Sequence, residues 1–124
     1  MNLDQATEKV YNAVNIYGLT NTLYTMFGKR VRIRVTFTKK DCDTPIEELS
    51  LSVRSYNALK RAGLDDIGKV VDALSEERIT KIRNLGGKSI AEIQGKVMEF
   101  GFDSMNVSEK KDFLMGVLKE NSVC

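Results

Sequence analysis

Hydrophobic residues recur at helical spacing in the first part of the chain. The apolar positions of this stripe are Leu3, Ala6, Val10, Ala13 and Tyr17. Residues three and four positions apart share one face of a helix, so the pattern predicts an amphipathic helix over residues 3–17 that ends at Gly18. The same spacing fits a short coiled-coil seam, but two alanines within two heptads favour packing inside the chain's own domain.

A period of two replaces the helical pattern further along. The apolar members are Val31, Ile33, Val35 and Phe37, and basic or hydroxyl residues lie between them. Successive side chains of a strand point to opposite faces, so this alternation predicts a β-strand over residues 30–38. Residues 22–27 are also rich in β-forming side chains and Gly28-Lys29 suits a two-residue turn, so we predict a β-hairpin. The alternative is a second short helix over residues 20–27, which leaves the strand to pair elsewhere, for example with another copy of the chain.

Basic residues are concentrated between positions 29 and 40, where six occur and no acidic residue does. Two interpretations stay open for this stretch. It is a solvated face of an edge strand that resists aggregation, or it contacts phosphates or an acidic protein surface. Residues 39–44 are polar and Pro45 follows them, so we place a domain boundary there.

Helical periodicity dominates the chain after Pro45. The first helix is predicted over residues 53–62, with Ser52 as its N-cap and Gly63 as its terminator. Two further helices are predicted over residues 66–74 and 108–119. Between them, one helix is predicted to begin at Ser75 and to bury Ile79 and Ile82. Another is predicted over residues 88–100, with Gly101 as its terminator. The helix over residues 108–119 has an apolar side for which the sequence assigns no packing partner.

The predicted fold class is therefore mainly α. Residues 44–102 form a compact bundle of short helices that contains a helix-hairpin-helix. Residues 1–43 precede it as a helix and a β-hairpin, and residues 103–124 add one extra helix.

The composition fits a soluble globular protein, with 42% hydrophobic and 29% charged residues among 124. There is no histidine, which excludes Ser-His and Cys-His nucleophile pairs and the common catalytic zinc sites. A carboxylate-only site stays open in principle, but no constellation points to one. We therefore expect a binding module with no catalytic site, no metal and no cofactor, and the net charge of +2 does not by itself indicate a nucleic-acid binder.

Cys42 and Cys124 lie far apart and form no CxxC motif, so both are expected to be free thiols. No stretch approaches the roughly 20 apolar residues that span a bilayer. The N-terminus also lacks the basic start and apolar run of a signal peptide, so the expected compartment is the cytoplasm.

The segment Ile82-Arg83-Asn84-Leu85-Gly86-Gly87-Lys88-Ser89 is the best candidate for chemistry. It ends like a phosphate-binding P-loop, but that motif needs a glycine where Ile82 stands and a strand before the loop. A helix-hairpin-helix fits better, because free N–H groups at the start of the following helix favour a phosphate. The structural alternative is a tight turn that uses glycine for a positive φ and close helix approach.

Two motifs in combination make the sequence recognisable. They are Val53-Arg54-Ser55-Tyr56-Asn57-Ala58-Leu59-Lys60 and Asn84-Leu85-Gly86-Gly87-Lys88-Ser89-Ile90-Ala91-Glu92-Ile93. With them, residues 45–102 closely resemble the C-terminal domain of the bacterial RNA polymerase alpha subunit. The resemblance implies a bundle of short helices that binds the minor groove of A/T-rich DNA and touches sigma factor and transcription regulators.

The resemblance also implies which residues contact DNA: Arg54, Asn57, Gly86, Lys88, Ser89 and Glu92. Arg54 suits a narrow, electronegative minor groove, and the glycine–lysine–serine segment suits phosphate. A carboxylate is unusual beside DNA, so we expect Glu92 to orient Arg54 or Lys88. The acidic patch that meets sigma factor is retained at Glu48, but Ser50 stands where a second acid is usual.

Three hypotheses follow for the function. The leading one is a DNA-binding module in transcription, a free-standing relative of the polymerase domain and a homodimer through residues 1–38. The second is a protein-interaction module that docks on RNA polymerase or a regulator. The third is a sequence-independent accessory domain of DNA repair or recombination.

Overall fold

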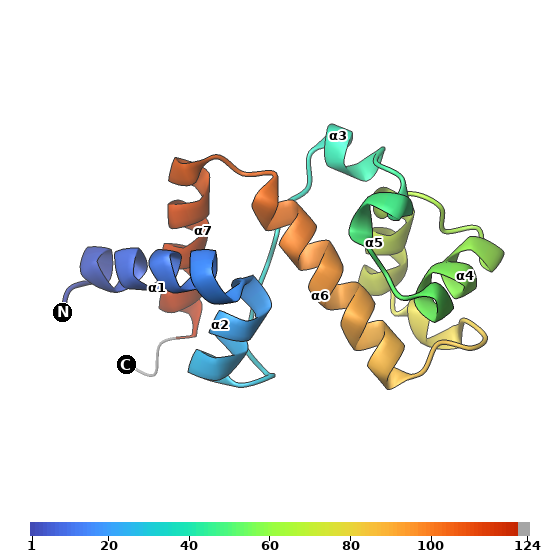
Figure 1. Cartoon of the computed structure of the whole chain (residues 1–124), viewed down its shortest axis with the longest axis horizontal. Coiled ribbons are helices and arrows are strands. Elements are labelled where there is room, and N and C mark those ends of the chain that lie inside the picture. The colour runs from blue at the N-terminus through green and yellow to red at the C-terminus, as the bar shows by residue number, and fades with distance from the viewer. Residues whose placement is uncertain (122–124) are drawn as a thin grey trace. The chain divides into compact units, whose positions relative to one another are not determined.

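The protein is described by a computed structural model, of which residues 1–121 are placed. Within this range the protein forms helices and no β-strand. The elements are α1 (Leu3–Tyr17), α2 (Leu19–Phe27), α3 (Lys39–Cys42), η1 (Ile46–Leu49), α4 (Val53–Arg61), α5 (Ile67–Ser75), η2 (Arg78–Lys81), α6 (Gly87–Asp103) and α7 (Val107–Glu120), η marking 3-10 helices (Figure 1). The mainly helical fold class is confirmed. No helix in the placed range is long and apolar enough to cross a membrane.

The protein divides into two compact units. The central unit is Phe37–Gly101, and the terminal unit combines residues 1–36 with the residues from Phe102 onward. Both ends of the sequence therefore contribute to one core, and the middle of the sequence forms the other.

The terminal unit is built by α1, α2 and α7, with α1 packed against the other two (Figure 1). Its buried core consists of Val10, Val14, Leu19, Leu23, Phe102, Leu114 and Val117. Both long helices start with a capping box, in which Asn2 pairs with Gln5 on α1 and Asn106 with Glu109 on α7. The apolar side of the last predicted helix thus has its partner in α1.

The predicted β-hairpin is wrong. Residues 19–27 are the helix α2, which Gly18 (φ 88°) separates from α1 and Gly28 (φ 80°) terminates. The alternative of a second short helix is confirmed. Its β-forming composition is overridden because Leu19, Thr22 and Leu23 fall at helical spacing and are buried in the terminal unit.

The alternating sequence pattern of residues 30–37 nevertheless matches an alternation of burial in the structure. The apolar positions are half-buried and the basic and hydroxyl positions between them are exposed: Val31, Ile33, Val35 and Phe37 against Arg30, Arg32, Arg34 and Thr36. This is the burial pattern of an extended segment with one covered face. No strand pairs with this segment among residues 1–121. Its apolar face is covered by helices and not by the β-sheet that we expected.

The central unit packs α4, α5 and α6 with the short turns η1 and η2. Its buried core consists of Ile46, Leu49, Ala58, Leu59, Leu64, Ile67, Val70, Ala73, Ile79, Leu85, Ile93 and Val97. Ser52 caps α4 as predicted, Asp66 caps α5, and Gly63 follows α4 with a φ of 78°. The first two predicted helices of this region are confirmed to within one or two residues at their ends.

Two details of the prediction are wrong in this unit. Ser75 ends α5 rather than opening a helix, and a four-residue 3-10 turn, η2, follows Glu77 (φ 59°). The element before the predicted hairpin is therefore this short turn. Gly101 does not stop α6, which continues to Asp103, because one glycine inside a helix costs only about 1 kcal/mol and Phe102 is buried beyond it.

Candidate nucleic-acid interface

The first motif segment lies at the start of α4. The hydroxyl oxygen of Ser52 accepts a hydrogen bond from the backbone N–H of Ser55 at 3.3 Å, which caps the helix. Arg54 and Asn57 follow, and both side chains are exposed. Residues three apart share a helix face, so the guanidinium and the amide are presented together. Arg54 makes no ion pair within the placed range.

The second motif segment lies at the start of α6. The backbone reaches it through a turn in which Asn84 has a φ of 70° and Leu85 is buried in the core. Gly86 precedes the helix, and its carbonyl oxygen accepts a hydrogen bond from the N–H of Ile90 at 3.0 Å. A glycine has no side chain with which to cap the first-turn N–H groups, and such groups are the ones that bind anions at helix starts.

The surroundings of this helix start are open. A Cβ added to Gly86 or Gly87 would meet no atom within 4 Å. Lys88 is exposed in the first turn and Ser89 is half-buried beside it. A bulky ligand could therefore approach the backbone here closely, with a cation and a hydroxyl at hand.

Glu92 connects the two segments. Its Oε2 accepts a hydrogen bond from the Ser52 N–H at 2.8 Å, and its Oε1 accepts from the hydroxyls of Ser52 at 2.9 Å and Ser55 at 2.5 Å. Ser52 and Ser55 flank Arg54 in the sequence, and Glu92 lies one helical turn after Lys88. The network therefore places the starts of α4 and α6 next to each other.

This role of Glu92 differs from the one that we expected. Its hydrogen bonds go to Ser52 and Ser55, not to Arg54 or Lys88. Burial opposes ionisation of the carboxyl, but the hydrogen bonds from Ser55 and Ser52 outweigh it and hold the pKa of Glu92 below its ordinary value. The N-terminus of α4 carries a partial positive charge, and the Glu92 carboxylate supplies the negative charge that this helix end attracts.

A separate polar cluster joins η1 to α4. The Tyr56 hydroxyl donates to Glu47 Oε2 at 2.6 Å, and Lys60 Nζ lies 3.3 Å from the same oxygen. The hydrogen bond from Tyr56 is the main reason that the pKa of Glu47 is lowered, and the same carboxylate raises the pKa of Tyr56 and of Lys60. Glu48, the expected contact for sigma factor, is exposed beside this cluster.

The central unit has a basic groove of about 550 Å³ that the sequence did not predict. Its walls include the exposed cations Arg61, Lys81 and Arg83, together with Asn84. None of the three cations forms an ion pair within residues 1–121. A signal was present for Arg61, which lies four residues after Asn57 and so shares its helix face.

The remaining candidate chemistry is limited. No group of three or more His, Cys, Asp or Glu among the placed residues could hold a metal ion. Cys42 is a free thiol within the placed residues, and burial together with the neighbouring Asp41 and Asp43 raises its pKa. Cys124 lies outside the placed residues.

These observations define a small all-helical domain that presents exposed polar and cationic side chains at two helix starts, held together by one carboxylate. The profile of the family described as the C-terminal domain of the bacterial RNA polymerase alpha chain matches residues 36–99, just over half of the sequence. The protein belongs to this family, and the resemblance expected from its two motifs is confirmed.

Curated relatives point the same way. The chain is 52% identical over 60 residues to the DNA-directed RNA polymerase subunit alpha of Rubrobacter xylanophilus, covering 48% of this chain and 19% of that subunit. It is 40% identical over 110 residues to the subunit of Moorella thermoacetica, covering 83% and 34%. The subunit of Desulforudis audaxviator is 51% identical over 61 residues, covering 49% and 19%. The chain thus spans between a fifth and a third of these relatives. No solved structure gives a significant match.

Proposed function

We propose that the central unit is a non-catalytic DNA-binding module that acts in transcription and contacts the minor groove and phosphate backbone of A/T-rich DNA. The observation that carries the proposal is the Glu92 network. It joins Ser52 and Ser55, which flank Arg54 in the sequence, to Glu92, which lies four residues after Lys88, and this supports a shared surface for the two segments. The membership of the polymerase alpha family supports the same assignment.

The two segments have different tasks in this proposal. Arg54 enters the narrow minor groove of an A/T tract, where negative potential is concentrated, and Asn57 bonds to backbone or base edges beside it. The start of α6 binds a phosphate with its N–H groups, the Lys88 ammonium and the Ser89 hydroxyl. Glu92 serves as the positioning residue that keeps the two helix starts in a fixed position relative to each other.

Binding of A/T-rich and G/C-rich duplexes over a range of salt concentrations tests this function. Arg54→Ala should remove the preference for A/T-rich DNA, at about 1–3 kcal/mol on the scale of specific contacts. Lys88→Ala should weaken binding to both duplexes alike and lower the salt slope by about one phosphate. Arg78→Ala is the control, because this exposed arginine of the same unit already pairs with Glu76 at 2.6 Å. An Arg54 variant that still prefers A/T-rich DNA would contradict the proposal.

The same titration separates the two other hypotheses. Equal affinity for both duplexes favours the sequence-independent accessory domain of repair or recombination. No binding near physiological salt favours a protein-interaction module for RNA polymerase, sigma factor or a regulator. In that case Glu48→Lys, which changes an exposed residue of η1, should reduce the capture of sigma factor.

Residues 1–38 are the proposed dimerisation segment. The terminal unit has a mostly apolar groove of about 710 Å³ along α1 and α2, and Tyr17 and Met26 on its walls are exposed. In a two-fold dimer each copy could cover the groove of the other. Sedimentation of the full-length protein over a concentration series measures this, and a monomer throughout would contradict it, whereas Tyr17→Glu should convert a dimer to a monomer.

A further inference from the structure

Three arginines form an exposed row in the terminal unit, outside the surface described above. Arg32 and Arg34 alternate with apolar residues of the extended segment, and Arg30 lies in the turn before it, where the Val31 N–H donates to the Gly28 carbonyl oxygen at 3.3 Å; all three arginines are exposed. The apolar residues between them face the other way, and Val31 and Ile33 pack against the terminal core. Alternate residues of an extended segment are about 6.6 Å apart, which is the spacing expected between Arg32 and Arg34.

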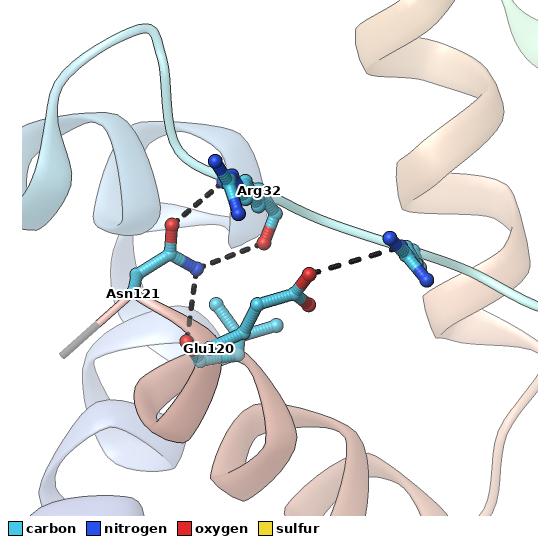
Figure 2. Close-up of polar contacts among 5 residues, drawn as sticks. Arg32, Glu120 and Asn121 are labelled. Atoms are coloured by element: carbon cyan, nitrogen blue, oxygen red, sulfur yellow. Dashed lines mark hydrogen bonds and ion pairs between the residues drawn. The ribbon is translucent and has the colours of Figure 1, made fainter.

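The end of α7 holds this segment in place (Figure 2). The N–H of Arg32 donates to Asn121 Oδ1 at 2.7 Å, and Asn121 Nδ2 donates to the Arg32 carbonyl oxygen at 2.8 Å. Asn121 Nδ2 also donates to the carbonyl oxygen of Val117 at 2.9 Å. The amide thus makes both of the bonds that a residue of an antiparallel strand would make, which fixes the backbone from which the arginines project.

The charge of the row is largely uncompensated. Arg34 Nε lies 3.7 Å from Glu120 Oε1, but the Arg34 side chain is 87% exposed, so this pair contributes little. Arg30 and Arg32 form no ion pair within residues 1–121, and residues 29–40 include no acidic residue.

We propose that Arg30, Arg32 and Arg34 are a second nucleic-acid site of this protein, which binds the phosphates of a duplex without regard to sequence. A guanidinium binds phosphate through two parallel hydrogen bonds. Each arginine presents its own guanidinium on a long side chain, so the three together can neutralise more than one phosphate of a duplex. Because the anchored backbone is already ordered, binding need not order it again.

The features of the row favour phosphate over an acidic protein surface. The core of a protein interface is depleted of charge and is anchored by aromatic or large apolar residues. The exposed positions of residues 30–36 are three arginines and a threonine, with no such anchor. The site also lies outside the central unit, so its existence does not depend on the proposed minor-groove contact of Arg54.

The test uses the full-length protein and a G/C-rich duplex, with affinity measured against salt concentration. The variant Arg30→Gln/Arg32→Gln/Arg34→Gln removes the row, and Lys9→Gln/Lys110→Gln/Lys111→Gln removes the same charge from α1 and α7 of the same unit. We expect the arginine variant to reduce the salt slope by about two to three units, at about 0.9 per phosphate. The lysine variant should reduce it by less than one. Single substitutions of the row should each reduce the slope by about one unit.

Each outcome bears on one proposal. An arginine variant whose slope equals that of the lysine variant overturns the second site, whatever Arg54→Ala does to the A/T preference. Loss of binding to a poly-glutamate peptide without a change in the DNA slope also overturns it and assigns the row to an acidic protein. Conversely, a reduced slope supports the row even if Arg54→Ala leaves the A/T preference intact, in which case only the proposed function of the central unit fails.

Discussion

The central and terminal units form their small cores from differently arranged parts of the sequence. The central unit is one continuous stretch of sequence, and its helices before α6 are short and joined by turns. The terminal unit brings together helices from the two ends of the sequence, α1 and α7. The family profile matches residues 36–99, which is almost the whole central unit and hardly any of the terminal one.

The difference is also one of chemistry. The central unit contains a carboxylate network, Glu92 with Ser52 and Ser55, that joins two helix starts. Ser55 is fully buried and Ser52 is exposed, so the network of the central unit extends from its core to its surface. The core cluster of the terminal unit is apolar, and its buried polar side chains within the placed range are two threonines, Thr7, whose hydroxyl donates to the Leu3 carbonyl oxygen at 2.8 Å, and Thr22.

The largest expected effect comes from truncating one fully buried leucine in either core. Leu59 in the central unit and Leu114 in the terminal unit are both fully buried. Leu59→Ala and Leu114→Ala should each cost about 2–5 kcal/mol of unfolding free energy, because each leaves a cavity. Amide hydrogen exchange, read separately for the two units, should show the main loss of protection in the unit that carries the substitution. Equal losses in both units would show that they unfold as one.

Removing the carboxylate network should have the next largest effect. Glu92→Ala leaves the fully buried Ser55 hydroxyl without its acceptor, at about 2 kcal/mol. Chemical denaturation at neutral pH measures the loss. Glu92→Gln, which keeps the shape and one acceptor oxygen, should lose less and serves as the control. Equal stability of the parent and both variants would contradict the role assigned to the network.

The same carboxylate predicts a pH dependence. The pKa of Glu92 is lower in the folded protein than its ordinary value of 4.5, so the folded state holds the proton less tightly than the unfolded state. Its stabilising contribution is fully present above pH 4.5 and is lost as the pH falls through the folded pKa. Denaturation midpoints below pH 4.5 should therefore fall less steeply for Glu92→Gln than for the parent. Parallel pH profiles would contradict the assignment.

A pair of glycines offers a comparison with opposite signs. A Cβ at Gly68 in α5 would lie 2.9 Å from Cys42 Cβ and 3.1 Å from the Cys42 carbonyl oxygen, so Gly68→Ala should destabilise the central unit by about 1–2 kcal/mol. Gly116 in α7 has no atom within 4 Å of such a Cβ, so Gly116→Ala should stabilise the terminal unit by about 0.5–1 kcal/mol. Thermal melting measures both, and shifts of the same sign would contradict the packing described here.

The smallest effects are expected at the anchor of the arginine row. Asn121→Ala removes the two bonds to the Arg32 backbone and should cost about 1 kcal/mol. Glu120→Ala removes the exposed pair with Arg34 and should change stability by no more than about 0.5 kcal/mol. Denaturant midpoints of the two variants test the order, and a larger loss for Glu120→Ala would reverse our view of which contact holds the segment.

The sequence by itself determined most of the central unit. Its helices were predictable because their signals are local: Ser52 as a capping hydroxyl, Gly63 after the helix end, and apolar residues at helical spacing. The family and its two motif segments were predictable for the same reason, since each motif is continuous in the sequence. The structure then showed that the two segments are joined by the hydrogen bond from Ser55 to Glu92.

Three features were decided by tertiary structure alone. Residues 19–27 became a helix because burial of Leu19 and Leu23 outweighs their β-forming neighbours, and local propensity is too weak to decide such a case. The bonds of Glu92 to Ser52 and of Asn121 to Arg32 join residues 40 and 89 positions apart, and no local pattern reports such a distance. The pairing of α1 with α7 was hidden likewise, because an apolar face shows that a helix must pack but not which helix covers it.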